Sequence, residues 1–108
     1  MKQVITSVGF QDPFGALISL GDLILDLSQD GVVITGGGQI ANRRVVLPLN
    51  ATGQITPTNI WFNDELTPTN TTYRATLMDN NLNMITDFGR WSIVGASADL
   101  STILPVTP

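Results

Sequence analysis

Hydrophobic and polar side chains alternate along short stretches of this chain, most regularly around Leu23, Leu25 and Leu27. These leucines are two residues apart, and Asp22 and Asp26 fall on the alternate positions. A period of two residues sends successive side chains to opposite faces of a β-strand. We therefore predict a strand whose leucines face a core and whose aspartates face away from it.

Similar short segments follow one another along the whole chain, separated by clusters of turn-forming residues. The predicted strands are Lys2–Phe10, a strand pair or one bent strand over Leu17–Leu27, Val32–Thr35, Ile40–Leu49, Ile60–Leu66, Thr72–Asp79 and Met84–Val94. No helical period persists for ten residues. Strands separated by turns every eight to twelve residues or so are typical of antiparallel sandwiches. We expect an all-β fold, a single β-sandwich domain over residues 1–108 with about seven to nine short strands.

The turns between these segments are rich in Gly, Pro, Asn and Asp, which suit tight backbone bends. The predicted turns are Gln11–Gly15, Ser28–Gly31, Asn50–Gly53, Thr67–Asn70 and Asp79–Asn81. Pro48 indicates an edge strand or a strand end, because proline donates no ladder hydrogen bond. Gly21 and Gly89 are the positions where a bend or bulge would invert the alternation of faces.

The apolar positions of these segments predict one hydrophobic core. Its expected members are Val4, Leu23, Leu25, Leu27, Val45, Leu47, Phe62, Tyr73, Ala75, Leu77, Ile93 and Leu100. With 43% hydrophobic residues, the chain can build such a core without disulfide or metal staples.

Histidine and cysteine are absent from the sequence, and only 13% of the residues are charged. Histidine is the usual general base, and cysteine is the strongest side-chain nucleophile. Their absence excludes Ser-His-Asp and Cys-His catalytic arrangements, ordinary zinc sites and disulfides. We therefore expect a protein that is not an enzyme and that carries no cofactor and no metal.

The charge and hydropathy of the chain limit which partners it can bind. The net charge is −4, and the basic residues are Lys2, Arg43, Arg44, Arg74 and Arg90. Nucleic-acid binding needs a basic stripe, which this set does not form. No apolar run approaches the roughly 20 residues that span a bilayer, and the start of the sequence lacks a signal peptide's apolar region. We expect no nucleic-acid partner and no membrane insertion.

One segment offers a candidate binding face. If Ile60–Leu66 is a strand, one face carries Asn59, Trp61, Asn63 and Glu65. The other face carries core residues, with Asp64 as the exception. An aromatic ring flanked by amides and a carboxylate can stack on a sugar and hydrogen-bond to it. Alternatively, Trp61 packs beneath a neighbouring loop or subunit. Both interpretations remain open from the sequence.

Other motifs favour structural interpretations. Asp79–Asn83 has the spacing that opens a calcium loop, but Met84 stands where Gly is needed and Arg90 where Glu is needed. An Asx-rich turn explains it better, with a weak cation site as the alternative. Asp22 and Asp26 share a strand face about 13 Å apart, beyond the roughly 5 to 9.5 Å of glycosidase carboxylates. Gly36–Gly38 lacks the rest of a phosphate-binding loop and indicates a flexible link.

Several motifs together resemble a known family. They are Leu47–Gly53, Ile60–Pro68, Thr72–Arg74 and Trp91–Gly95, with Asp99 and Leu100 after them. This order is similar to the small prealbumin-like or immunoglobulin-like β-sandwich modules of bacteriophage tail and tail-fibre proteins. The likeness extends over roughly residues 17–108, although the Asn80–Asn83 hairpin lacks the glycine usual in those modules.

The resemblance implies a non-enzymatic structural subunit of a phage particle, or alternatively a carbohydrate-binding, host-recognition module that uses the Trp61 face. The implied partners are copies of the same chain, other virion proteins or a cell-surface glycan. Virion proteins are made in the host cytoplasm and need no signal peptide, so the expected location is the virion. Lys2–Phe10 and the apolar stretch Leu100–Val106 are candidates for pairing across subunits, with residues 100–108 as an exchanged or docking strand.

Overall fold

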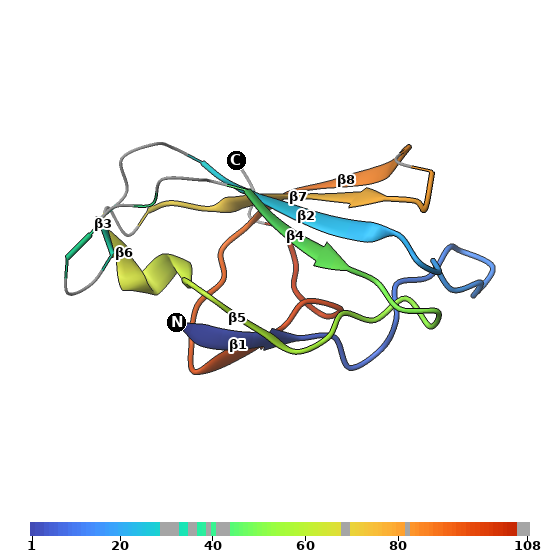
Figure 1. Ribbon diagram of the computed structural model, residues 1–108, viewed down its shortest axis with the longest axis horizontal. Helices are drawn as coiled ribbons and strands as arrows, with labels where there is room; N and C mark the ends of the chain where they lie inside the picture. The colour runs from blue at the N-terminus through green and yellow to red at the C-terminus, as the bar shows by residue number, and fades with distance from the viewer. Residues whose placement is uncertain are drawn as a thin grey trace.

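Short β-strands in two packed layers make up nearly all of the regular structure (Figure 1). The structure, a computed structural model, describes residues 1–28, 33–34, 37–38, 40, 44–67, 70–81 and 83–105. The strands are β1 (Lys2–Ile5), β2 (Asp22–Leu27), β3 (Val33–Ile34), β4 (Arg44–Pro48), β5 (Thr58–Ile60), β6 (Leu66–Thr67), β7 (Tyr73–Met78), β8 (Met84–Trp91) and β9 (Ser97–Asp99). One 3₁₀ turn, η1 (Asn63–Glu65), lies between β5 and β6.

The two layers are sheets of different construction. The larger sheet has the antiparallel order β4-β2-β7-β8, and the smaller has the order β5-β1-β9, with β1 antiparallel to β5 and parallel to β9. A two-stranded ladder of β3 and β6 lies at one end. The prediction of an all-β sandwich is therefore confirmed.

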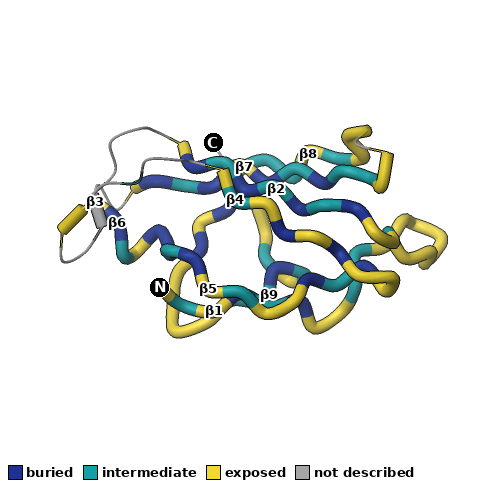
Figure 2. The backbone as a smooth tube through the Cα atoms, viewed as in Figure 1, coloured by how far each residue is buried: buried dark blue, intermediate teal, exposed yellow. Residues whose placement is uncertain are grey.

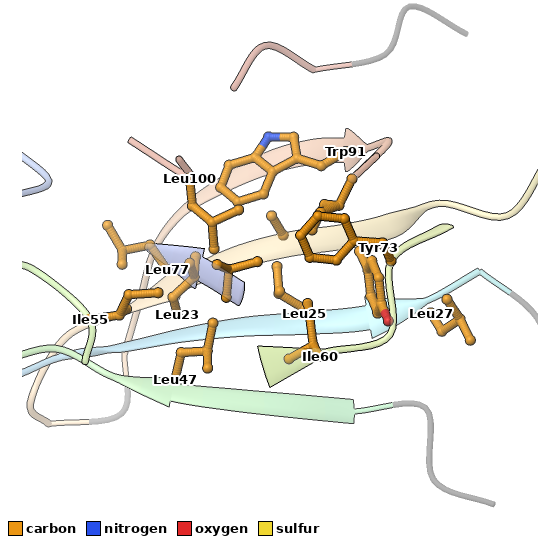
Figure 3. Close-up of a cluster of buried hydrophobic side chains, with 14 of the residues drawn as sticks. Leu23, Leu25, Leu27, Leu47, Ile55, Ile60, Tyr73, Leu77, Trp91 and Leu100 are labelled. Atoms are coloured by element: carbon orange, nitrogen blue, oxygen red, sulfur yellow. The ribbon is translucent and has the colours of Figure 1, made fainter. Parts of the chain in front are cut away.

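The core lies between the two sheets, as the alternation on β2 predicts. Leu23, Leu25 and Leu27 are buried, while Asp22 and Asp26 are half-buried on the outer face. The other predicted core residues are also buried, except Val45, which is half-buried against the core. Figure 2 shows buried positions alternating with less buried ones along the strands, and Figure 3 shows side chains from both sheets interdigitating in the core.

Leu49 and Ile55 also belong to the core, although the sequence did not single them out. They pair with each other across the predicted Asn50–Gly53 turn. The Asn50 carboxamide oxygen accepts hydrogen bonds from the backbone N–H groups of Thr52 and Gln54, at 2.9 and 3.1 Å. The turn is thus confirmed, and it carries its two flanking side chains inward.

Asx-type turns also form at two other predicted positions. The Asp12 carboxylate accepts backbone hydrogen bonds from Phe14 and Ala16, and the Asp79 carboxylate accepts them from Asn81 and Asn83. The turn interpretation of Asp79–Asn83 is therefore confirmed at its described residues. The Ser28–Gly31, Gly36–Gly38 and Thr67–Asn70 predictions lie partly outside the described residues.

Of the two glycines expected to disturb strand phase, Gly89 does so, whereas Gly21 lies just before β2 and shows no register change. Gly89 has φ +81°, and the β7–β8 register changes beside it, since Ala75 pairs with Gly89 while Thr76 pairs with Asp87. This is a β-bulge. Gly21 permits a close approach of two chain segments, because a Cβ atom there would lie 2.0 Å from the Met78 carbonyl oxygen.

Several predicted strands are shorter than expected. β1 ends at Ile5, β2 begins only at Asp22, and Leu100 lies in a turn, with no strand following it as far as residue 105. β1 is also the central strand of its sheet, so both of its edges are occupied within the chain. It therefore has no open edge for pairing with a second subunit, because its ladder is already satisfied on both sides.

Candidate functional site

The segment that was expected to form one strand, Ile60–Leu66, bends instead, so that prediction is wrong. β5 stops at Ile60, and residues 63–65 form the 3₁₀ turn η1. The Glu65 carboxylate accepts a hydrogen bond from the Phe62 N–H at 3.0 Å, and the Glu65 N–H donates to the Phe62 carbonyl at 2.9 Å. This reciprocal pair of bonds has the arrangement of a capping box and satisfies both backbone N–H groups.

Asn63 is the residue around which this bend is organised. Its side chain is fully buried, and its carboxamide oxygen accepts the Ile93 N–H at 2.8 Å. Its backbone N–H donates to the Ile93 carbonyl at 2.8 Å, and its amide nitrogen donates to Thr71 Oγ1 at 3.3 Å. Asn63 therefore joins three segments in place of a sheet ladder and is unavailable to a ligand.

The four predicted site residues consequently do not share a face. Asn59 is exposed on β5, and Trp61 is half-buried just after it. Glu65 is half-buried and, besides holding the turn, lies 3.3 Å from the Met1 amino group. Of the four, only Asn59 and Trp61 are brought together around a hollow.

That hollow is a pocket of about 420 Å³ between an edge of each sheet, termed here the Trp61 pocket. β4 and β5 are the strands whose outer edges flank it. It is lined by Met1, Leu27, Ile40, Arg44, Val45, Thr58, Asn59, Ile60, Trp61 and Tyr73. Leu27, Ile60 and Tyr73 lie together at this end of the core (Figure 3). Its size and its apolar lining with a few polar groups are typical of small ligand sites.

Tyr73 ties the pocket to the core. Its hydroxyl donates to the Trp61 carbonyl oxygen at 2.5 Å, which fixes the backbone that carries the indole ring. Burial, and to a smaller extent the nearby Glu65 charge, raise the pKa of Tyr73 to about 12. Tyr73 is therefore a neutral hydrogen-bond donor throughout the physiological range and is unsuited to act as a base.

Arg44 borders the pocket, but its charged group lies on the outer face of the larger sheet beside Asp26. Its guanidinium forms two hydrogen bonds with the Asp26 carboxylate, at 3.0 and 3.3 Å, across the β2–β4 pair. This contact positions Arg44 along the strand edge.

The carboxylates elsewhere serve structural contacts. Asp64 accepts hydrogen bonds from the Gly95 N–H at 3.1 Å and from Lys2 Nζ at 3.2 Å, and these contacts lower the pKa of Asp64. Asp87 pairs with Arg74, which lowers the pKa of Asp87. Among the described residues, no three acidic side chains gather as a metal site would require.

Sequence reasoning found Asn59 and Trp61 but missed the rest of the pocket. Leu27, Val45 and Tyr73 were expected as core residues, and Arg44 was seen only as a scattered charge. They come from strands far apart in the sequence, so no local spacing could have indicated that they meet. The one local signal for the pocket was Trp61 itself, a large aromatic residue in a stretch that is otherwise rich in Thr, Asn and Asp.

The described residues contain no helix long and apolar enough to cross a membrane. Comparison with known proteins finds no family model that matches the sequence, and no curated protein or solved structure that matches it significantly.

Proposed function

We propose that this chain is a non-enzymatic structural module of a phage particle, in its tail, fibre or a related assembly. The observation that carries the proposal is the exposure of several large apolar side chains, four of them within one connection between strands. Exposed apolar clusters, more than scattered single residues, mark surfaces that another protein covers.

Four of the ten exposed large apolar side chains of the described residues lie in the β1–β2 connection, residues 6–21, which reaches the right-hand end of Figures 1 and 2. The exposed ones there are Val8, Phe14, Leu17 and Leu20. Phe14 is 96% exposed. A protein with only 13% charged residues offers little electrostatic repulsion between neighbouring copies at such a surface. The similarity of the sequence motifs to phage tail modules supports the same role.

The test is whether the chain is part of the particle. Phage particles whose genome encodes this chain would be purified on a density gradient and analysed by mass spectrometry. We expect peptides of this chain to co-sediment with capsid and tail proteins at a fixed ratio across the particle band. Recovery of the chain only in the particle-free fraction would contradict the proposal.

A second function, carbohydrate binding, is favoured by the Trp61 pocket. The pocket is lined by Trp61 and Asn59, whose residue types stack on sugars and hydrogen-bond to their hydroxyl groups. Because Trp61 is half-buried and fixed through Tyr73, little conformational freedom would be lost on binding.

A glycan array tests this second function. We expect the wild-type chain to bind a defined set of glycans and Trp61→Ala to lose that binding while keeping its melting temperature within a few degrees. Phe14→Ala, at the opposite end, is the matched control and should bind as the wild type does. Absence of binding across the array would leave the structural role as the better explanation.

A further inference from the structure

Charge is distributed unevenly between the two ends of the larger sheet. The row of paired residues that crosses the strands at one end contains three arginines: Arg44, Asp26, Arg74 and Arg90. The row at the other end of the same strands contains none: Pro48, Asp22, Met78 and Met84. Lys2, at the start of β1, lies at the arginine end, where Figure 1 marks the N-terminus. The described basic residues therefore all lie toward one end of the sandwich.

The opposite end, at the right of Figure 1, is built from connections that are fastened to one another. We term it the loop end; it comprises residues 10–22, 50–53, 79–81 and 84–85. The Leu20 N–H donates to the Asn50 carbonyl at 3.1 Å. Gly21 lies so close to Asp79 that a Cβ atom on the glycine would be 3.3 Å from the Asp79 Cα atom. The connections therefore present a single surface.

The ionisable side chains of the loop end are all acidic. They are Asp12, Asp22 and Asp79, and the loop end contains no lysine or arginine. Backbone N–H groups donate to the carboxylates of Asp12 and Asp79, which stabilises their ionised form. An approaching molecule therefore meets a negative potential, which favours a partner surface that carries cations.

The same end exposes half of the large apolar side chains that are exposed among the described residues. They are Phe14, Leu17, Leu20, Met84 and Ile85. Single exposed apolar residues are ordinary, whereas several at one end of a small domain indicate a surface that another molecule covers. The complementary surface must therefore be apolar as well as basic.

Leu20 is held in a backbone conformation that leucine rarely adopts. Its φ is +59°, in the left-handed region where the Cβ atom crowds the following carbonyl oxygen. This conformation leaves the Leu20 side chain 58% exposed. Strained residues concentrate at functional sites, and contact with a partner would offset the cost of presenting this side chain to solvent.

We propose that the loop end docks into an apolar cleft rimmed by lysine and arginine side chains on a different protein of the same particle. A second copy of the chain offers few uncompensated cations, because Lys2, Arg44 and Arg74 each pair with a carboxylate of their own chain. The inference rests on the structural role proposed above and specifies the partner's chemistry.

An amphipathic helical peptide of leucine and lysine is the probe for the isolated chain, and a leucine–glutamate peptide of the same pattern is its counterpart. The lysine peptide should shift the backbone amide NMR signals of the loop end, and the glutamate peptide should shift none. Phe14→Ser should weaken binding by about tenfold or more. Leu104→Ser, which removes an exposed apolar side chain elsewhere, should bind as the wild type does. Equal binding of both peptides, no binding, or shifts confined to other residues overturns the inference.

Leu20→Gly separates docking from folding. Glycine adopts a positive φ without strain, so the melting temperature should stay the same or rise. Binding of the lysine peptide should nevertheless weaken several-fold, because the exposed leucine side chain is lost. A Leu20→Gly variant that binds as tightly as the wild type would remove Leu20 from the proposed contact.

In assembled particles, a photoreactive benzoyl-phenylalanine at position 14 should cross-link to a different virion protein, at a segment where lysine or arginine adjoins apolar residues. Cross-links to a second copy, a solution mass that rises above 11.6 kDa, or binding to phosphatidylcholine vesicles through Phe14 assigns the loop end to another occupant and overturns the inference. Absence of the wild type from particles contradicts the structural role, whereas the peptide measurements decide the docking chemistry independently.

Discussion

Asn63 shows how one buried polar residue can replace regular sheet pairing. Its carboxamide and backbone hold Ile93 on one side and Thr71 on the other, so the chain can bend after β5 without leaving buried polar groups unpaired. An isolated Asn in an alternating segment gives no sign of this role, because the same residue type is common on exposed strand faces. Whether such an Asn is a buried bridge or a surface residue depends on which distant segments pack against it.

Replacement of Asn63 by Ala should destabilise the fold by about 1–3 kcal/mol, because the buried Ile93 N–H loses its acceptor. Chemical denaturation monitored by tryptophan fluorescence measures the change. Asn59→Ala is the matched control on the exposed surface and should change stability by less than about 0.5 kcal/mol. Equal effects of the two substitutions would show that the Asn63 bonds contribute little.

At the scale of elements, β2 is the part of the fold that the sequence predicts best. Its alternation places the leucines inward, and it lies between β4 and β7 at the centre of the larger sheet. The segment after β5 was mispredicted because Ile60, Phe62 and Leu66 are all buried, as a strand would require. The Glu65 bonds to Phe62 are local, but the Asn63 bonds that hold the bend depend on Ile93, 30 residues away. Alternation alone could therefore identify the buried positions without revealing the bend.

Leu25→Ala and Ile24→Ala compare the two faces of β2. Leu25 is fully buried, so its truncation should cost about 2–5 kcal/mol through lost burial and a residual cavity. Ile24 is half-buried on the outer face, and its truncation should cost clearly less. Urea unfolding of both variants tests the order, and a larger loss for Ile24→Ala would mean that the outer face is covered in solution.

At the scale of the whole molecule, Asp99 links the end of β9 to the segment after β1. Its carboxylate accepts hydrogen bonds from Ser101 Oγ at 2.6 Å, from the Ser101 N–H at 3.0 Å and from the Ser7 N–H at 3.1 Å. These bonds, those from Ser101 above all, lower the pKa of Asp99 to about 2 from a usual value of 3.8.

This shift predicts an acid-dependent loss of stability. A depressed folded-state pKa stabilises the fold above the unfolded-state value, and this stabilisation disappears as the pH falls through the folded-state value. The contribution of Asp99 should therefore be complete above about pH 4 and decline toward pH 2. Unfolding free energies measured across this range should fall less steeply for Asp99→Asn than for the wild type. An equal pH dependence of the two unfolding free energies would show that Asp99 does not cause the acid-dependent loss.

The parallel pairing of β1 with β9 also constrains when the sandwich can be completed. Gln3 pairs with Ser97, so the smaller sheet joins segments from nearly opposite ends of the sequence. Contacts this distant along the chain slow folding, because a long loop must close before they form. On the ribosome, the larger sheet can assemble before β9 is synthesised, while the edge of β1 that pairs with β9 is still open. A copy whose synthesis stops before β9 would keep that edge open to aggregation and proteolysis.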